Sequence, residues 1–307
     1  MKKILIIGAS GLTGYQLANL AKKNFEVYGT FNKREISIPD CHIFQLDKTD
    51  SNKTQSLLSE IKPELVIDCS ALHNVDYCEE HKDETLEINT ESPKSIAQLC
   101  KDMNARFLNI STDYVFDGTL NRPYKEDDEP NPLNFYGISK RKAEQEIAKI
   151  GGSYAIARTS LIFGWNPHEI AGEKSSSGKS QNFVIWALSK LRNEEPLKIV
   201  TDQYSNPTFA NNLAEMLLAL GNSNVNGIFH TAGKTCLSRY DFTREIAEVF
   251  NIDPQLISPV TSDEFNQVAE RPMRPCLNVS KITEIFDGKI LSSKEALENM
   301  KELEMES

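Results

Sequence analysis

An apolar run that ends directly in a glycine-rich turn constrains this chain more than any other feature. The segment "KKILIIGASGLTGYQLA" (residues 2–18) places three glycines between a predicted strand and a predicted helix. Glycine permits a tight turn and lets the backbone approach a pyrophosphate, while the helix N-terminus offers free N–H groups. A turn without a ligand is the alternative, but the position between strand and helix favours a dinucleotide-binding unit. The predicted cofactor contacts in this loop are Gly8, Ser10, Gly11, Leu12 and Gly14.

The first 164 residues continue to alternate between apolar runs and helical patterns. Further strands are predicted at 25–31, 42–47, 64–71, 105–116 and 153–164, and helices at 50–63, 83–104 and 132–151. Pro93 predicts a bend or a junction within the helix at 83–104. Strands that are apolar throughout and alternate with helices are typical of a parallel sheet covered on both faces. The fold class is therefore predicted to be a Rossmann-type, doubly wound α/β sheet.

The alternation loosens after residue 164, where a polar segment with a Ser/Gly cluster predicts a loop that could act as a lid. Helices are predicted at 182–193, 208–222, 238–252 and 292–307, with one strand at 227–233. The predicted division is a dinucleotide-binding domain at 1–164, rejoined by about 205–232, and a smaller α/β substrate-binding domain at about 165–204 and 233–307.

Composition excludes several classes of protein. A net charge of −10 argues against a broad nucleic-acid surface, which needs clustered Lys and Arg. No apolar stretch approaches the length of a membrane span, so no membrane partner is expected. The six cysteines form no CxxC pair, which argues against zinc and dithiol motifs. Without a recognisable export signal, reduced thiols and a cytoplasmic location are predicted.

The segment after the second predicted strand indicates which dinucleotide binds. An acidic residue there binds the ribose 2′-hydroxyl of NAD, whereas Arg or Lys accepts the 2′-phosphate of NADP. This chain has Asn32, Lys33 and Arg34 at that place, which favours NADPH and leaves NADH as an alternative.

The ends of the next two predicted strands supply further cofactor contacts. Asp47 and Lys48 follow the third strand, where an adenine could be held. Ser70 and Ala71 end the fourth strand with small residues, as close approach to a cofactor requires. All of these positions belong to one edge of the predicted sheet.

Tyr136 and Lys140 lie four residues apart in the predicted helix at 132–151, so their side chains share one face. Such a pair is expected by chance in a chain this long, and its context must give it meaning. Upstream, "NISTDYVFDG" ends a predicted strand with Ser111, Thr112 and Asp113. These side chains are predicted at the carboxyl edge of the sheet, where ligands bind in such folds.

The sequence resembles the extended short-chain dehydrogenase/reductase family, and within it the dTDP-4-dehydrorhamnose reductases. The shared segments are "STDYVFDG", "PYKEDDEPNPLNFYGISK", "ARTSLIFG", "VTDQYSNPTFANNLAE" and "ERPMRPCLNVSKI". The resemblance implies an NADPH-dependent reductase of a nucleotide-linked 4-keto-6-deoxy sugar, with dTDP-L-rhamnose as the product in the rhamnose case. A homodimer is compatible with it.

The resemblance gives three residues catalytic roles. Tyr136 is expected to protonate the carbonyl oxygen, and Thr112 to hydrogen-bond that oxygen as charge develops. Lys140 is expected to favour the phenolate and to hold the nicotinamide ribose. An unperturbed tyrosine has a pKa of about 10, which a nearby cation lowers.

Five residues are expected to face the substrate, although each could instead be structural. Arg271 could face a diphosphate through a bidentate guanidinium. Tyr114 stands where related dehydratases usually carry Glu, which argues against dehydration. Asn89 either helps to order the active site or lies on a helix surface. The five expected substrate contacts are Tyr114, Asn182, Phe183, Thr208 and Arg271.

No metal is expected. Some bacterial relatives bind magnesium through glutamates at a dimer contact, but Gln16 occupies one of those positions here.

Two other functions remain open. One is a non-catalytic NADP-binding subunit resembling the β subunit of methionine adenosyltransferase, which keeps similar motifs and acts mainly by binding a partner enzyme. The other is a different sugar-nucleotide epimerase or reductase.

Overall fold

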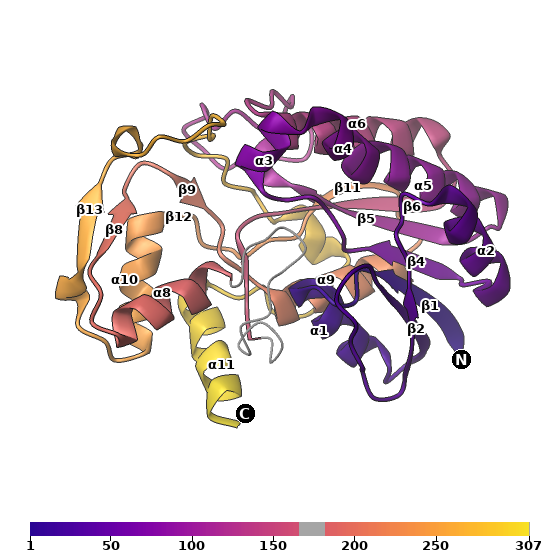
Figure 1. Cartoon of the computed structure of the whole chain (residues 1–307), viewed down its shortest axis with the longest axis horizontal. Coiled ribbons are helices and arrows are strands. Elements are labelled where there is room, and N and C mark those ends of the chain that lie inside the picture. The colour runs from indigo at the N-terminus through magenta and orange to yellow at the C-terminus, as the bar shows by residue number, and fades with distance from the viewer. Residues whose placement is uncertain (166–181, 307) are drawn as a thin grey trace.

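Seven parallel strands form the central sheet of the structure, a computed structural model that describes residues 1–165 and 182–306. Their order is β11-β6-β5-β4-β1-β2-β3 (Figure 1). The direction of winding reverses between β1 and β4, which is where open α/β sheets bind ligands. The strands are β1 (Lys2–Ile7), β2 (Phe25–Phe31), β3 (Cys41–Gln45), β4 (Leu65–Asp68), β5 (Arg106–Thr112), β6 (Tyr154–Thr159) and β11 (Gly227–His230).

Helices cover both faces of this sheet, as the apolar strands require. One face packs against α1 (Leu12–Ala21) and α9 (Ala210–Asn222). The other packs against α2 (Ser51–Ile61), α5 (Ser92–Asp102) and α6 (Phe135–Ile150). Figure 1 shows the two helical layers on opposite sides of the strands. The predicted Rossmann-type α/β fold is therefore confirmed.

The helix predicted at 83–104 is divided. It consists of α4 (Lys82–Leu86), a π-helical turn (η1, Glu87–Glu91) and α5, and the short helix α3 (Val75–Glu80) precedes it. Pro93 lies in the first turn of α5, directly after the π-helical turn, and has no N–H to donate to the preceding turn. Pro93 therefore marks a junction, as predicted, and the π-helical turn accommodates it.

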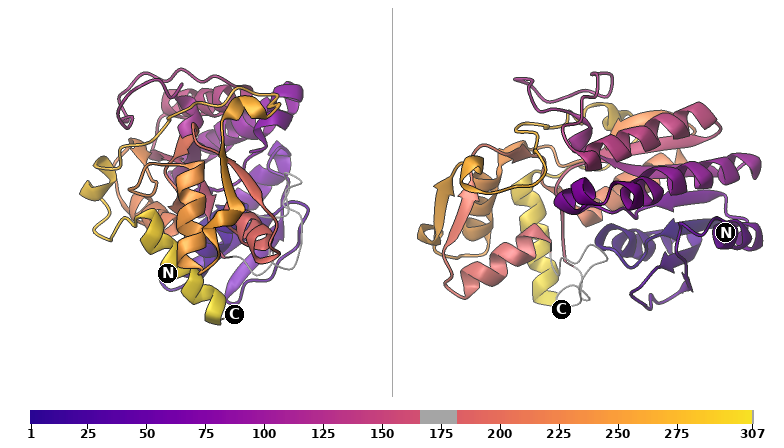
Figure 2. Two further views of the ribbon diagram at one scale, coloured as in Figure 1. Left: turned by 90° about the vertical axis from the view of Figure 1, so that its left-hand side faces the viewer. Right: turned by 45° about the horizontal axis from the view of Figure 1, so that its top comes forward.

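A smaller unit lies at one end of the molecule (Figure 2). Its core is formed by α8 (Phe183–Arg192), α10 (Arg239–Val249) and α11 (Ser293–Glu306) together with β8 (Leu197–Val200). β8 pairs in parallel with β13 (Ile257–Val260). Neither strand was predicted, because a strand of only four residues gives little periodic signal. The division into two domains at the stated boundaries remains a proposal.

Short elements join the two units. β7 (Ile162–Phe163) pairs with β10 (Thr208–Phe209), and β9 (Tyr204–Ser205) with β12 (Leu237–Ser238). The 3-10 turns are η2 (Asp113–Val115), η3 (Pro254–Leu256), η4 (Ser262–Glu264) and η5 (Lys281–Glu284). The predicted strands at 105–116 and 153–164 are thus too long, since they end at Thr112 and Thr159. The predicted loop after residue 164 lies, from residue 166 to 181, outside the described residues.

The expectation that all thiols are reduced is wrong for one pair. Cys236 and Cys276 form a disulfide, although 40 positions separate them. The fold brings the residue before β12 next to the C-terminal segment, which no local pattern predicts. Cys41, Cys69, Cys78 and Cys100 are free. None of the described helices combines the length and apolarity that crossing a membrane requires.

Candidate active site

The glycine loop lies at the carboxyl edge of β1, beside the end of β4. Gly8 adopts a φ of +83°, and a Cβ there would lie 2.9 Å from the Cβ of Ser70. A Cβ on Gly14 would lie 2.2 Å from the carbonyl oxygen of Gly8, so only glycine lets α1 start this close to β1. Gly11 caps α1 without a side-chain hydrogen bond, so the first-turn N–H groups can meet an anion. These features fit a dinucleotide pyrophosphate.

A buried ion pair supports the end of β4. The Lys48 ammonium lies 2.8 Å from a carboxylate oxygen of Asp68 and 2.8 Å from the carbonyl oxygen of Ser70. The Ser70 backbone N–H and hydroxyl both donate to Asp68. Lys48 thus fixes the strand end where Ser70 and Ala71 face the glycine loop. Its ammonium is engaged within the protein, and a contact between this segment and an adenine remains a prediction.

The residues expected at the adenosine ribose lie at the neighbouring strand ends. Asn32 and Lys33 are exposed after β2, and Arg34 is partly buried. The carbonyl oxygen of Asn32 accepts a hydrogen bond from Gln45. Asp47 is exposed, and its carboxylate accepts from the backbone and hydroxyl of Thr49. Their contacts with a 2′-phosphate and an adenine remain predictions.

Tyr136 and Lys140 lie on the first two turns of α6. Asn134 caps this helix by accepting a hydrogen bond from the backbone of Gly137 at 2.9 Å. A Cβ on Gly137 would lie 2.2 Å from the carbonyl oxygen of Tyr114, so α6 begins in close contact with the turn after β5. Thr112, at the end of β5, lies close enough to the Tyr136 phenol to lower its pKa, although burial outweighs this effect. The structure thus brings the three predicted catalytic residues to one sheet edge.

Burial sets the protonation states of Tyr136 and Lys140. It raises the pKa of Tyr136 well above its ordinary value, so the phenol keeps its proton. Burial lowers the pKa of Lys140 to about 8, and nearby Lys48 acts in the same direction. No carboxylate among the described residues forms an ion pair with Lys140. The site therefore presents a neutral phenol and a buried cation with hydrogen-bonding capacity for a ligand.

Asn89 fixes the back of this group. Its carbonyl oxygen accepts from the Leu72 N–H at 2.8 Å, and its amide donates to the Leu72 carbonyl at 2.9 Å. The same amide contacts the Ser139 hydroxyl at 3.2 Å, next to Lys140. Asn89 is buried in the π-helical turn, so the alternative of a helix-surface asparagine is wrong.

A second buried network holds α6 against the sheet. Arg158 on β6 donates two hydrogen bonds of 2.8 Å to Glu144, one turn after Lys140. Ser111 on β5 donates to the same carboxylate at 2.6 Å. Sequence reasoning missed Glu144, although its spacing places it on the helix face that carries Tyr136 and Lys140.

Asp113 and Tyr114 form the wall beside the catalytic phenol. Asp113 is buried and accepts from Ser160 at 2.5 Å and from Thr112 at 3.1 Å. Burial raises the pKa of its carboxyl to about 6. The Tyr114 ring meets the Tyr136 ring edge-on, with 6.0 Å between their centroids. A neutral ring thus stands where a dehydratase would place a second carboxylate.

The predicted substrate contacts separate into two groups. Asn182 caps α8 through Ile185 and donates to the Gly164 carbonyl, and Thr208 is buried and bonded to the backbone of Asn206 and Gly233. Phe183 and Tyr114 instead meet at Arg239, which sequence reasoning missed. All five substrate contacts remain predictions.

Arg271 makes a bidentate ion pair with Asp76 at the N-terminal end of α3, with distances of 2.6 and 2.8 Å. This contact joins the C-terminal segment to the larger unit. It supports the structural alternative for Arg271, because the guanidinium that could face a diphosphate already binds a carboxylate.

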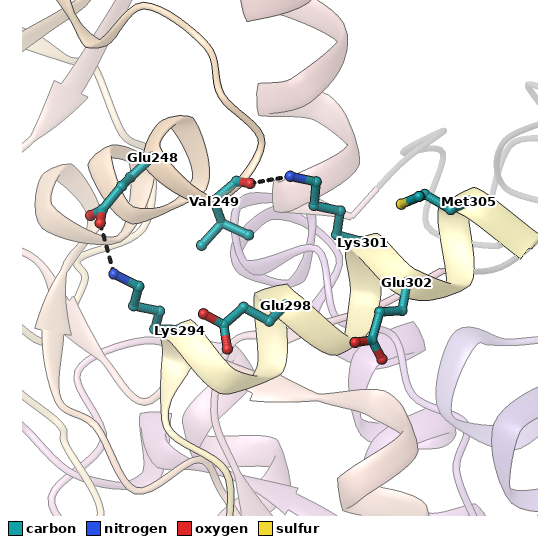
Figure 3. A pocket seen from close by; sticks show the side chains of 7 residues that line it. All are labelled: Glu248, Val249, Lys294, Glu298, Lys301, Glu302 and Met305. Carbon is teal, nitrogen blue, oxygen red and sulfur yellow. Dashed lines mark hydrogen bonds and ion pairs between the residues drawn. The ribbon is translucent and has the colours of Figure 1, made fainter.

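A surface pocket of about 380 Å³ lies between α10 and α11, in the smaller unit (Figure 3). Its Lys294 pairs with Glu248 at 2.7 Å, and its Lys301 donates to the Val249 carbonyl. Both cations are therefore satisfied within the protein.

In the part of the chain that the structure describes, no three His, Cys, Asp or Glu side chains are grouped to hold a metal ion. Gln16 hydrogen-bonds Trp165 and Asn211.

Comparison with known proteins identifies the family. The family model described as RmlD substrate binding domain matches residues 1–305. The chain belongs to this family. A curated relative from Haloferax volcanii, the probable low-salt glycan biosynthesis reductase Agl14, is 32% identical and covers 96% of this chain and 94% of its own.

Two further relatives bear on function within the family. A dTDP-4-dehydrorhamnose reductase of Bacillus anthracis, solved in complex with NADP, has a TM-score of 0.83 at 27% identity and covers all of both chains. Methionine adenosyltransferase 2 subunit beta of Danio rerio is 29% identical, covering 92% of this chain and 84% of its own. The proteins similar to this chain thus include one named as a reductase and one named as a subunit of another enzyme.

Proposed function

We propose that this protein is an NADPH-dependent reductase of a nucleotide-linked 4-keto-6-deoxy sugar, converting dTDP-4-dehydrorhamnose to dTDP-L-rhamnose. The observation that carries the proposal is that Thr112 lies beside the buried phenol of Tyr136, one helical turn from the buried cation of Lys140. This group lies at the sheet edge that also carries the glycine loop. The B. anthracis relative with NADP supports the choice of cofactor.

The chemistry follows from the protonation states. NADPH bound along the glycine loop supplies hydride to the carbonyl carbon. Thr112 donates its hydroxyl proton to the carbonyl oxygen, for which the hydroxyl turns away from Asp113, and so orients the oxygen against Tyr136. Tyr136 enters the reaction protonated, since burial raises its pKa, and it gives this proton to the oxygen as negative charge develops there. Lys140 stabilises the phenolate that remains.

The wall at Asp113 and Tyr114 favours reduction over dehydration. Removal of water needs an acid and a base positioned on the sugar. Asp113 is engaged by Thr112 and Ser160, and Tyr114 carries a neutral phenol. The site therefore lacks the paired acid and base at these positions.

The remaining assignments belong to the same proposal. Lys33 and Arg34 bind the 2′-phosphate of NADPH, and Asn32, Asp47, Ser70 and Ala71 line the rest of the cofactor site. The enzyme acts in the cytoplasm, as a homodimer, on a nucleotide sugar. The cytoplasmic assignment rests on the sequence alone, and the disulfide between Cys236 and Cys276 is unusual for that compartment.

The test offers the purified protein and NADPH a panel of 4-keto-6-deoxy nucleotide sugars. Net NADPH consumption with one sugar, and the reduced sugar as product, supports the proposal and names the substrate. A protein that binds NADPH, turns over no sugar and copurifies with another enzyme supports the regulatory-subunit alternative. Activity without net NADPH consumption supports an epimerase.

A further inference from the structure

Arg239 brings a cation from the smaller unit to the catalytic wall. It is the first residue of α10, and its backbone N–H donates to the Gln203 carbonyl at 2.9 Å. Its guanidinium lies 5.0 Å from the centre of the Phe183 ring and close enough to Tyr114 to be affected by it electrostatically. This cation–π contact holds the guanidinium over the aromatic ring. Arg239 is therefore held next to the ring that contacts Tyr136.

Arg271 has a carboxylate partner, whereas Arg239 has none among the described residues. Arg271 lies close enough to Arg239 to repel it, but Arg271 makes a bidentate ion pair with Asp76. Among residues 1–165 and 182–306, no carboxylate forms an ion pair with Arg239. Asp113, whose charge acts on Arg239, is buried and bonded to Thr112 and Ser160. A partly desolvated guanidinium without a counter-ion in the described part of the chain predicts an anionic ligand.

We propose that Arg239 binds the phosphate that is attached to the sugar of the nucleotide substrate. This inference rests on the proposed function, because that function places the C4 carbonyl at Thr112 and Tyr136. The phosphate on C1 lies across the sugar ring from C4, and Tyr114 is a neighbour of both Tyr136 and Arg239. The planar guanidinium can donate two hydrogen bonds to a phosphate. In a chain of net charge −10, such a local cation also offsets repulsion of an anionic substrate.

The test measures how much the sugar-proximal phosphate contributes to binding. Calorimetry with NADP⁺ present gives the Kd of dTDP and dTMP, and of UDP and UMP, for the wild type, Arg239→Gln and Arg239→Lys. We expect the wild type to prefer a diphosphate over its monophosphate by roughly 10- to 100-fold, the range of a charge-assisted hydrogen-bonded pair. Arg239→Gln should remove most of that preference, and Arg239→Lys should remove part of it.

The matched control is Arg244→Gln, which removes an exposed cation from the same helix. It should leave the diphosphate preference unchanged. Unaltered NADPH affinity and thermal stability in Arg239→Gln exclude misfolding as the cause. If that variant does not fold, Arg239→Lys alone carries the test, because it keeps the charge and loses the planar fork.

Two results contradict the inference. One is a wild type that prefers neither diphosphate over its monophosphate, and the other is an Arg239→Gln variant that keeps the full preference. Failure of the proposed function is distinguishable, because binding is measured without turnover. A protein that reduces a keto sugar but shows no role for Arg239 keeps the function and loses this inference. A protein that turns over no sugar but binds diphosphates through Arg239 supports this inference and contradicts the proposed function.

Discussion

Replacing Glu144 with Gln should destabilise the protein far more than the loss of one surface charge. Glu144 and Arg158 both have fully buried side chains, and two hydrogen bonds of 2.8 Å join them. The substitution would keep the shape of the side chain but would leave the Arg158 guanidinium buried without a counter-charge. The new amide group would also meet the N–H donors of Arg158 or Arg141.

The expected loss in unfolding free energy is about 3–5 kcal/mol, the usual cost of removing one partner of a buried ion pair. At about 2.1 cal/mol/K of unfolding entropy per residue, a chain of 307 residues should lose about 5–8 °C in Tm. Urea and thermal unfolding followed by circular dichroism measure both quantities. Since α6 also carries Tyr136 and Lys140, reductase activity should fall as well.

The matched control is Glu146→Gln on the same helix. Glu146 pairs with Lys94 at 3.3 Å with both side chains partly exposed, so its loss should cost about 0–1 kcal/mol. A Glu144→Gln variant that is no less stable than Glu146→Gln would refute the reasoning.

The pH dependence supplies a second readout for Glu144. Burial opposes its ionisation, but the hydrogen bond and charge of Arg158 outweigh burial and lower the carboxyl pKa. A folded-state pKa below the unfolded value means that the stabilisation is complete above about pH 4.3 and is lost as the pH falls through the folded-state pKa. The stability difference between wild type and Glu144→Gln should therefore narrow in acid.

Three further predictions follow from the cofactor site and the disulfide. Gly14→Ala places a Cβ 2.2 Å from the Gly8 carbonyl oxygen, whereas Gly11→Ala places one at 3.4 Å. Gly14→Ala should therefore be the less stable variant, and in a fluorescence titration it should bind NADPH at least 10-fold more weakly. Equal stability of the two variants would contradict the close packing of α1 on this loop. Replacing Lys33 and Arg34 with Ala should lower kcat/KM with NADPH by roughly 10-fold or more and should leave kcat/KM with NADH unchanged. An equal fall in kcat/KM with both cofactors would argue against a 2′-phosphate contact. Thiol titration of the unreduced, denatured protein should detect the four free cysteines, and six reactive thiols would show that the disulfide does not form. The Cys236→Ser, Cys276→Ser double variant should lose about 4 kcal/mol of unfolding free energy, as expected for a sequence separation of 40.

The sequence was sufficient for the features that local patterns encode. The apolar strands, the glycine loop and the helical spacing of Tyr136 and Lys140 each depend on residues close together in the chain. Parallel strands then bring Gly8, Ser70 and Thr112 to one edge, so the cofactor loop and the catalytic end of β5 could be predicted without coordinates.

The features that were missed depend on contacts between distant segments. Arg239 gains its meaning only when α10 meets Tyr114, and Cys236 only when the C-terminal segment reaches β12. Arg271 matched a sequence block near the substrate, but its partner Asp76 comes from a distant part of the chain. Side-chain partners of this kind are set by tertiary packing, which local periodicity does not encode.

The most direct test of the central claim compares Tyr136→Phe with the wild type on the sugar that the panel identifies. Phenylalanine keeps the ring at the active site and removes only the hydroxyl that donates the proton. We predict that NADPH binding is retained and that kcat falls by about 10²-fold or more, the usual contribution of a positioned general acid. A variant that consumes NADPH at the wild-type rate would contradict the role of Tyr136 as the proton donor.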